Sequence, residues 1–300
     1  MTKRAFFIFC LLLLSATGSA AAEKRILALQ SVAIAPYDQA VRGFEHTYGA
    51  EIQRLMISEQ KEKNVLKKIQ ELRPDMVLAV GRDALLVASR IKTLPVVYAM
   101  VLNPSSLLAG EQHINGVSMN LPPEKQLREL LRVLPAVQSI GLLYDPAQTG
   151  IFVQGLREAA GKMHVNLAAL EVHRSRDVPL ALHRLKGKAD IFWMLPDITV
   201  TTPATAESML LFSLENKLPI LTFSEKYLEL GAMLTIGIDP FDIGSQAGEM
   251  AQKILSGNIG KVGQQHVDAR KASISVNWEI ARKLGMAIDQ KAIRNNRSNR

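Results

Sequence analysis

The chain has 300 residues, of which 48% are hydrophobic and 21% are charged, a balance typical of a globular protein and unlike that of a disordered or fibrous one. A chain of this length usually forms two or more units with separate cores. The formal charge of +8 is spread along the sequence, so a nucleic-acid-binding protein is not expected. The basic cluster 294–300 is short, and we expect it to belong to a disordered tail over 289–300.

The first residues carry the pattern of an export signal. Lys3 and Arg4 precede an apolar run, 5–14, and small residues follow it. This order predicts a secretory signal peptide over 1–22, cleaved near Ala22, and hence a periplasmic protein. The run is well short of the roughly 20 residues of a membrane span. Cys10, the only cysteine, lies in the run, so the mature chain is expected to lack disulfides, reactive thiolates and cysteine metal sites.

Two stretches of the chain repeat the same order of elements. Short strand-like runs alternate with helical patterns over 25–100, and the alternation begins again over 139–223. Asp75 and Asp190 lie at matching positions in the two copies, and each precedes a five-residue apolar strand. Right-handed crossovers turn each copy into an open parallel sheet with helices on both faces. The sequence therefore predicts an α/β protein with two Rossmann-like lobes.

The segments outside the repeat are expected to connect these lobes. Residues 116–120 can cross from lobe 1 to a helix of lobe 2, and the elements after residue 232 return to lobe 1 and then to lobe 2. These passages make a hinge of three segments. The expected boundaries are 23–118 plus 239–266 for lobe 1 and 119–238 plus 267–288 for lobe 2.

Two such lobes favour the binding of a small molecule between them. In open α/β sheets, ligands bind beyond the carboxyl ends of the strands, where helix N-termini offer free N–H groups. Two edges of this kind that face each other across a hinge can close over a solute. The predicted ligand-binding residues are those near the strand ends: Gln30, Ser31, Tyr37, Gly81, Arg82, Asp83, Met100, Asn103, Tyr144, Asp145, Gln148, Thr149, Asp197, Thr199, Phe223, Ser224 and Asp239.

Several ordered motifs carry a resemblance to a known family. They are Gly116-Val117-Ser118, Pro123 to Leu127, Ile140 to Pro146, Pro196 to Val200, Gly231-Ala232, Ile238-Asp239 and Gly244. In these motifs the chain resembles the tryptophan/tyrosine-type substrate-binding proteins of ABC importers, from about residue 26 to 284. The resemblance implies the type I periplasmic-binding-protein fold, reversible binding of a small solute and delivery to an inner-membrane ABC permease. We expect the solute to be an amino acid, with aromatic amino acids among the candidates, or a related carboxylate.

Asp197 is the leading candidate contact. It follows a buried strand and precedes a helix, where an unpaired carboxylate can hold an ammonium group, and the resemblance places a ligand loop here. A helix N-cap is the alternative, and the two roles are compatible. Gly81 would let backbone N–H groups approach a carboxylate. Arg82 and Asn103 depart from the family pattern, which has a small hydroxyl residue and an aspartate at these positions.

Three side chains have a second interpretation. Arg82 can face the cleft or pair with Asp83 or Asp75 outside it. Tyr144 and Phe223 can stack on an aromatic solute or simply pack at the strand ends.

Other functions find little support in the sequence. No zinc-protease pattern, nucleophile elbow, phosphate loop or dinucleotide fingerprint occurs, so neither an enzyme nor a cofactor is expected. A periplasmic sensor that presents its closed state to a receptor uses the same clamp, and the sequence leaves this alternative open. We expect a monomer.

Overall fold

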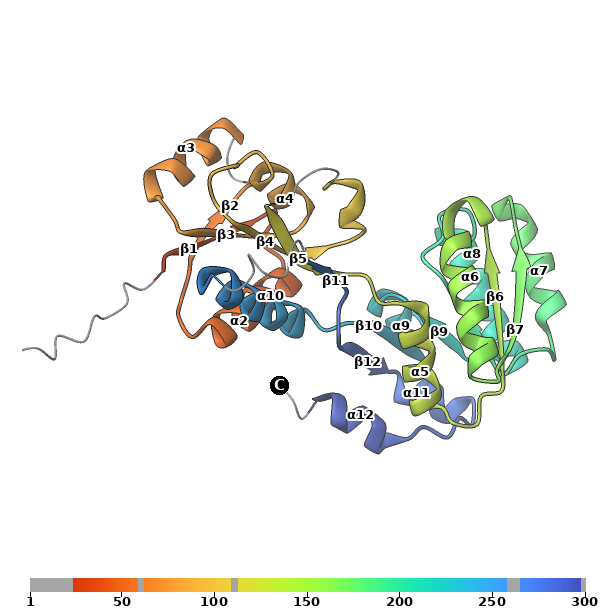
Figure 1. Ribbon diagram of the computed structural model, residues 1–300. Helices are drawn as coiled ribbons and strands as arrows, with labels where there is room; N and C mark the ends of the chain where they lie inside the picture. Colours follow the sequence, from red (N-terminus) through yellow and green to blue (C-terminus); the bar gives the residue numbers. More distant parts are fainter. Residues whose placement is uncertain (1–23, 59–61, 109–112, 258–264, 298–300) are drawn as a thin grey trace, which may run out of the picture.

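The computed structural model describes residues 24–58, 62–108, 113–257 and 265–297, and it contains two α/β lobes joined by crossing segments (Figure 1). The predicted signal peptide and the last three residues of the predicted tail lie outside these ranges. Among the described residues, no helix is long and apolar enough to cross a bilayer.

Lobe 1 is built on a six-stranded sheet whose paired strands all run parallel. The strands, in spatial order, are β11 (His266–Val267), β5 (Ile114–Ser118), β4 (Val96–Val101), β3 (Met76–Val80), β1 (Ile26–Gln30) and β2 (Gln53–Met56). The helices are α2 (Ala35–Tyr48), α3 (Glu62–Leu72), α4 (Arg82–Ala88) and α10 (Pro240–Leu255), with a short 3₁₀ turn, η1 (Pro104–Ser106).

Lobe 2 repeats this plan with one antiparallel strand. Its order is β12 (Ala272–Val276), β10 (Leu234–Ile238), β9 (Ile220–Thr222), β8 (Ile191–Trp193), β6 (Ser139–Tyr144) and β7 (Asn166–Glu171), and β12 runs antiparallel to β10. The helices are α5 (Pro123–Val133), α6 (Pro146–Lys162), α7 (Val178–Leu185), α8 (Pro203–Asn216), α9 (Glu225–Glu229), α11 (Trp278–Lys283) and α12 (Gln290–Arg297), with a 3₁₀ turn, η2 (Ser175–Asp177). The predicted fold class is confirmed.

Each sheet separates two apolar clusters, because strands buried on both faces need helices on both sides. In lobe 1, Ala28 packs in the cluster that includes residues of α2 and α10, and its neighbour Leu29 packs in the cluster that includes residues of α3 and α4. In lobe 2, Leu142 and Leu143 divide in the same way between the α5–α6 side and the α7–α8 side. This alternation fixes the register of the central strands.

Both lobes also share one hydrogen bond between an aspartate and the backbone. The carboxylate of Asp75 accepts the backbone N–H of Arg25 at 2.8 Å, and the carboxylate of Asp190 accepts the backbone N–H of Ser139 at 2.8 Å. In each lobe this aspartate precedes the third strand and ties it to the start of the first. The hydrogen bond from Arg25 lowers the pKa of Asp75, although burial opposes it. At Asp190 burial raises the pKa, but the hydrogen bonds from Gln138 and Ser139 together lower it.

Close helix packing attaches α10 to lobe 1. A Cβ added to Gly244 would lie 1.8 Å from the carbonyl oxygen of Ala40, and one added to Gly43 would lie 1.9 Å from that of Phe241. Only glycine allows the backbones of α2 and α10 to approach so closely. Ser245 Oγ donates to the carbonyl of Gly43 at 3.3 Å across the same contact.

The described chain passes between the lobes three times. In the first crossing, Met119 packs against the lobe 1 core and Leu121 lies in the lobe 2 core. In the second, Ile238 packs against both cores. In the third, Ala269 is buried in lobe 1 and Ala272 in lobe 2. The segment 266–276 therefore forms two strands, β11 in lobe 1 and β12 in lobe 2, with a crossing between them.

One expectation about the C-terminus is wrong. Residues 290–297 form α12 instead of a disordered tail. Ala292 and Ile293 are buried in the lobe 2 core, and Arg132 donates to the carbonyl of Ala292. These two apolar side chains and the bond from Arg132 allow this short basic segment to pack on lobe 2.

Candidate functional site

The carboxyl ends of the strands in both lobes lie beside the hinge. β5 runs parallel to both of its neighbours and ends at the point where the chain leaves lobe 1. β10 runs parallel to β9 and ends where the chain leaves lobe 2. The edge of each sheet where ligands bind in open α/β folds is therefore the edge next to the other lobe. In Figure 1 the two lobes diverge from the crossings, an open arrangement.

Ser31, Tyr37 and Gly81 meet at this edge of lobe 1. Ser31 Oγ accepts the backbone N–H of Ala84 at 2.9 Å and donates to the carbonyl of Val80 at 3.2 Å, which joins the loops after β1 and β3. Gly81 has φ of +92°, and a Cβ there would lie 2.6 Å from the Tyr37 ring. Burial, and after it the carboxylate of Asp83, raises the pKa of the Tyr37 hydroxyl.

Two predicted lobe 1 residues belong to the interior. Gln30 is fully buried, and its Nε2 donates to Asp38 Oδ1 at 3.1 Å, whereas its Oε1 is a buried acceptor with no hydrogen-bond donor. Met100 is 2% exposed and packs in the α2–α10 cluster. In this open arrangement neither side chain is accessible to a solute.

The charged and amide candidates of lobe 1 lie on its surface. Arg82 Nη1 is 4.0 Å from Asp83 Oδ1, and both side chains are largely exposed. Asp75, the other partner considered for Arg82, is near Lys24 at 3.6 Å instead. Asn103 is exposed, and its backbone N–H donates to Asn120 Oδ1 at 3.2 Å, close to the first crossing.

Asp197 is buried and fully hydrogen-bonded, so the expectation of an unpaired carboxylate is wrong. It is 1% exposed. Its Oδ2 accepts the backbone N–H of Asp145 at 2.8 Å and the hydroxyl of Thr149 at 2.6 Å. Its Oδ1 accepts the backbone N–H groups of Thr199 and Val200 at 3.0 and 3.1 Å. Four donors from the protein occupy the lone pairs that an ammonium group would use.

Asp145 joins the same network from the other side. Its side chain caps α6 by accepting the N–H of Ala147 at 3.0 Å, and its Oδ2 accepts the hydroxyl of Thr199 at 2.7 Å. The Thr199 hydroxyl, followed by the Ala147 N–H, lowers the pKa of Asp145, and His173, 3.9 Å away, acts in the same direction. The loops after β6 and β8 are thus held as one rigid surface.

The remaining lobe 2 candidates divide between packing and exposure. Tyr144 is buried and its hydroxyl donates to Glu171 Oε1 at 2.9 Å, which is the strand-end packing alternative. Phe223 is 39% exposed and meets Tyr227 edge-on, with ring centroids 5.5 Å apart. Ser224 is half-buried at the N-terminus of α9, and Gln148 is exposed on the first turn of α6.

Asp239 lies at the second crossing. It is 6% exposed and accepts the N–H of Asp242 at 3.2 Å as the N-cap of α10. It belongs to the hinge and not to either open edge.

Sequence comparison decides the family. The family model described as "ABC transporter substrate binding protein" matches residues 50–298, most of the chain. The chain is an ABC transporter substrate-binding protein.

Relatives and solved structures are consistent with this membership. A "Tyrosine-binding protein" of Clostridioides difficile is 24% identical over 234 residues, covering 75% of this chain and 67% of its own. A ligand-free, open substrate-binding protein with adhesive properties from Clostridium difficile gives a TM-score of 0.72 at 22% identity, covering 89% of this chain and 96% of that one. A Streptococcus pneumonia structure in complex with L-Trp gives 0.52 at 21% identity, covering 90% and 97%.

The facing edges of this substrate-binding protein also expose apolar side chains that the sequence analysis missed. On lobe 1, Val32 and Leu102 are 37% and 63% exposed, and on lobe 2, Ile151 and Ile198 are 92% and 75% exposed. Val32, Leu102 and Ile198 lie in loops that follow strand carboxyl ends, and Ile151 lies in the second turn of α6. Their positions after β-strands are a signal in the sequence, but an apolar residue there is equally typical of the core.

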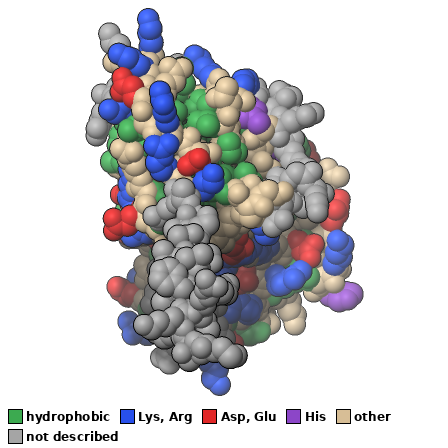
Figure 2. Space-filling view, turned by 60° about the vertical axis from the view of Figure 1, so that its left-hand side comes forward, with side chains coloured by type: hydrophobic (Ala, Val, Ile, Leu, Met, Phe, Trp, Pro, Cys, Tyr) green, Lys and Arg blue, Asp and Glu red, His purple; other side chains and the backbone are tan. Residues whose placement is uncertain are grey.

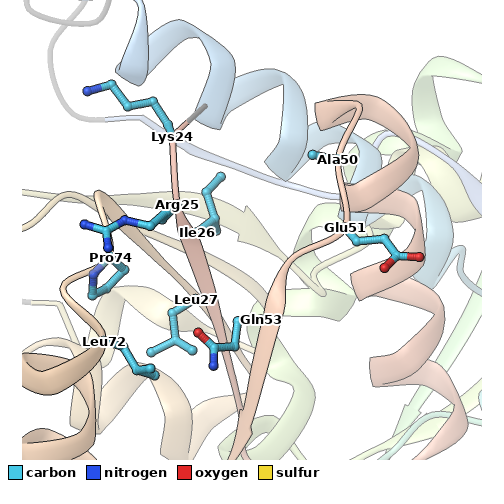
Figure 3. Close-up of a pocket in the computed structure, with 9 residues that line it drawn as sticks. All are labelled: Lys24, Arg25, Ile26, Leu27, Ala50, Glu51, Gln53, Leu72 and Pro74. Atoms are coloured by element: carbon cyan, nitrogen blue, oxygen red, sulfur yellow. The ribbon is translucent and has the colours of Figure 1, made fainter. Parts of the chain in front are cut away.

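Two hollows lie elsewhere on lobe 1 of the substrate-binding protein. One, of about 230 Å³, is at the amino ends of β1 and β2, where Arg25 and Glu51 point away from each other above Leu27 (Figure 3). The other, of about 550 Å³, lies between α3 and the segment before β4, with Ile69 and Leu94 in its wall. Figure 2 shows Lys and Arg side chains around hydrophobic ones on this lobe. Neither hollow includes a predicted ligand contact.

The parts of the chain that the structure covers contain no group of three or more His, Cys, Asp or Glu side chains able to hold a metal ion. The candidate site of this substrate-binding protein consists of the two carboxyl-terminal strand edges and their loops.

Proposed function

We propose that this substrate-binding protein captures an amino acid between its lobes, with aromatic amino acids as the first candidates, and delivers it to an ABC permease for import. The observation that carries the proposal is the pair of strand edges at the hinge, in a chain whose family binds transporter substrates. Its matched relatives include a tyrosine-binding protein and a protein solved with L-Trp, which suggest the side-chain class.

The apolar residues on both edges fit this ligand class. Ile198 and Phe223 on lobe 2 and Leu102 on lobe 1 offer contact area to an aromatic ring. Tyr37 adds a ring beside Gly81. The α-amino and carboxylate groups of the solute would use the exposed polar groups nearby, Gln148 and the accessible part of Thr199 in lobe 2 among them.

The proposed role of Asp197 changes in the light of its contacts. Because four protein donors saturate its carboxylate, we assign it the positioning of Thr149 and Thr199 instead of direct contact with an ammonium group. The other predicted contacts stay part of the proposal, with Gln30 and Met100 requiring a rearrangement on closure.

The location and the reaction class follow from the same proposal. The basic start and apolar run of residues 3–14 support export to the periplasm, with cleavage near Ala22. The solute is bound and released unchanged, as a transport protein requires. We further propose that the mature chain works as a monomer.

Binding is tested with the purified mature chain and a panel of the twenty amino acids. A ligand that binds only the folded state adds about 2.7 kcal/mol of stability at 100 times its dissociation constant, which is easily seen as a rise in melting temperature. L-Tyrosine or L-tryptophan is expected to give the largest rise, and chromatography of the released solute is expected to recover it intact. A panel in which no amino acid stabilises the chain would contradict the proposal.

Transport is tested separately in cells that lack the protein. Loss of uptake of the bound amino acid would support delivery to a permease. Normal uptake together with loss of a transcriptional response to the amino acid would favour the sensing alternative.

A further inference from the structure

Arg270 lies in the short interval where the third crossing changes lobes. Ala269 before it is 2% exposed in the lobe 1 core, and Ala272 after it is 5% exposed in the lobe 2 core. Any rotation between the lobes must change the backbone of this crossing within the residues between these two anchors.

The side chain of Arg270 reaches back to lobe 1. Its Nε is 3.0 and 3.1 Å from the two carboxylate oxygens of Asp242, and its Nη1 is 2.8 and 3.0 Å from the two of Glu249. Both acids are on α10, whose attachment to α2 fixes it in lobe 1. Planar guanidinium groups paired in this way are directional as well as charged, so they orient the backbone that carries them.

The main chain around Arg270 is held by lobe 2. Lys125, near the start of α5, donates to the carbonyl of Ala269 at 3.3 Å and to the carbonyl of Arg270. Helix α5 packs in the lobe 2 core through Leu127 and Leu130. Residue 270 is therefore bonded to lobe 1 through its side chain and to lobe 2 through its carbonyl oxygen.

Asp242 makes the pairing with Arg270 costly to lose. Its side chain is only 5% exposed, and besides Arg270 it contacts Lys271 at 3.5 Å and accepts from Gln246 Nε2 at 3.2 Å. Removal of the Arg270 guanidinium would leave this poorly hydrated carboxylate with only the more distant Lys271 as a cationic partner, which destabilises the arrangement that now pairs them.

The first crossing is hydrogen-bonded to the third on the lobe 1 side of Arg270. Ser118 Oγ donates to Asp268 Oδ1 at 2.6 Å, and the N–H of Ala269 donates to the carbonyl of Asn120 at 3.2 Å. The first and third crossings thus form one hydrogen-bonded unit up to Ala269. Bending is left to the residues immediately beyond this unit.

We propose that Arg270 is a positioning residue of the hinge, which clamps the third crossing to Asp242 and Glu249 and so holds the open arrangement of the lobes. The proposal rests on the proposed function only in assuming that the lobes move. Removal of the guanidinium is expected to lower the ratio of open to more closed arrangements of the lobes by about tenfold. This is the effect of losing a hydrogen bond to a charged group.

The test measures the distance between the lobes without any solute. Spin labels are placed on exposed positions of α3 and α6 of the mature chain through Lys67→Cys and Glu158→Cys, since Cys10, the only cysteine of the sequence, lies in the predicted signal peptide. Pulsed dipolar spectroscopy then gives the distance distribution. The unaltered hinge is expected to give one narrow population, and Arg270→Gln a second or broader one.

The controls separate the clamp from a general loss of charge or stability. Arg128→Gln removes a guanidinium that pairs with Glu124 in the same helix at 2.6 Å, and is expected to leave the distribution unchanged. Arg270→Lys keeps the charge but loses the paired geometry, so an intermediate distribution is expected. Thermal melting of each variant ensures that every distance is measured on folded protein.

An Arg270→Gln distribution that superimposes on that of the unaltered hinge would overturn the proposal, as would an equal shift in Arg128→Gln. Because no solute is present, this result does not depend on the identity of the bound amino acid. Conversely, if no amino acid stabilises the chain, the distance measurement still tests the role of Arg270.

Discussion

The buried carboxylate of Asp197 accepts the backbone N–H of Asp145 at an N···O distance of 2.8 Å. This bond joins the loop after β6 to the loop after β8, whose residues are 52 positions apart in the chain. Together with the Thr149 hydroxyl at 2.6 Å, it makes Asp197 the centre of the lobe 2 edge. The residue that the sequence marks as a ligand contact is thus the one that holds the loops in place.

Asp197→Ala is expected to lower the free energy of unfolding by about 3 kcal/mol, because it leaves buried N–H donors without an acceptor. Urea denaturation of the mature chain measures the change. Asp177→Ala, which removes an exposed carboxylate paired with Arg174, is the control, with an expected change within about 0.5 kcal/mol. An Asp197→Ala variant of normal stability that no longer binds its amino acid would instead support direct contact.

Gly244→Ala tests the close approach of α2 and α10. The added Cβ would lie 1.8 Å from the carbonyl oxygen of Ala40, so the helices must separate, and the free energy of unfolding is expected to fall by about 3 kcal/mol. Gly161→Ala provides the matched change in α6, where nothing lies within 4 Å of the new Cβ. There alanine is expected to raise stability by about 0.5 kcal/mol, and equal losses in both variants would contradict the packing argument.

Thr199→Val is expected to make stability depend less on acid pH. The Thr199 hydroxyl is the main cause that lowers the pKa of Asp145 in the folded state. When the pKa of a carboxyl group is lower in the folded than in the unfolded state, the group stabilises the fold. This stability is fully present above the unfolded pKa of about 4, and it is lost as the pH falls through the folded pKa. The stability difference between wild type and Thr199→Val should therefore be full at pH 7 and shrink in strongly acidic buffer.

Unfolding curves from pH 7 to pH 2.5 measure that difference, and carbon NMR of the Asp145 carboxyl group reports its pKa directly. A pKa of Asp145 that does not rise in Thr199→Val would show that the hydroxyl is not the cause. Thr201→Val, which removes a donor to the carbonyl of Leu195 and not to a carboxylate, should give a difference that is independent of pH.

The two lobes could be predicted because the residues that define them are local and repeated. Apolar strands such as β3 are continuous runs in the sequence, and Asp75 and Asp190 follow the start of their copies at spacings that differ by only one residue. The first residues of the helices were harder to predict. The apolar periodicity of α6 becomes clear only from Phe152, but the helix begins at Pro146, since its first turns carry no apolar pattern. The Asp-Pro pair of an N-cap followed by N1 was the available signal.

The site was harder to predict, because its hydrogen bonds join residues far apart in sequence. Whether the carboxylate of Asp197 is free depends on Thr149, which is 48 positions earlier and lies on α6. No local pattern records that contact. Exposure has the same difficulty: Ile198 resembles a core residue in the sequence, and only the arrangement of the loop leaves it 75% exposed.

Gly81→Ala tests the lobe 1 half of the site. The backbone of Gly81, at φ +92° and ψ 169°, is in a region open essentially to glycine alone, so alanine is expected to lower the free energy of unfolding by about 2 kcal/mol. The new Cβ would also lie 2.6 Å from the Tyr37 ring and 2.7 Å from Ser31 Oγ, so the ring must move. Because burial is the main cause that raises the pKa of Tyr37, a displaced ring should titrate at lower pH.

Gly187→Ala is the matched control for Gly81→Ala. Gly187 also has a positive φ, +70°, but nothing lies within 4 Å of its added Cβ, so the variant is expected to lose about 1 kcal/mol from backbone strain alone. NMR titration of ring-labelled tyrosine should show an unchanged pKa of Tyr37 in this control and a lower one in Gly81→Ala. If the pKa of Tyr37 stays the same in both, the ring does not depend on the missing side chain of Gly81, and the proposed lobe 1 surface needs another support.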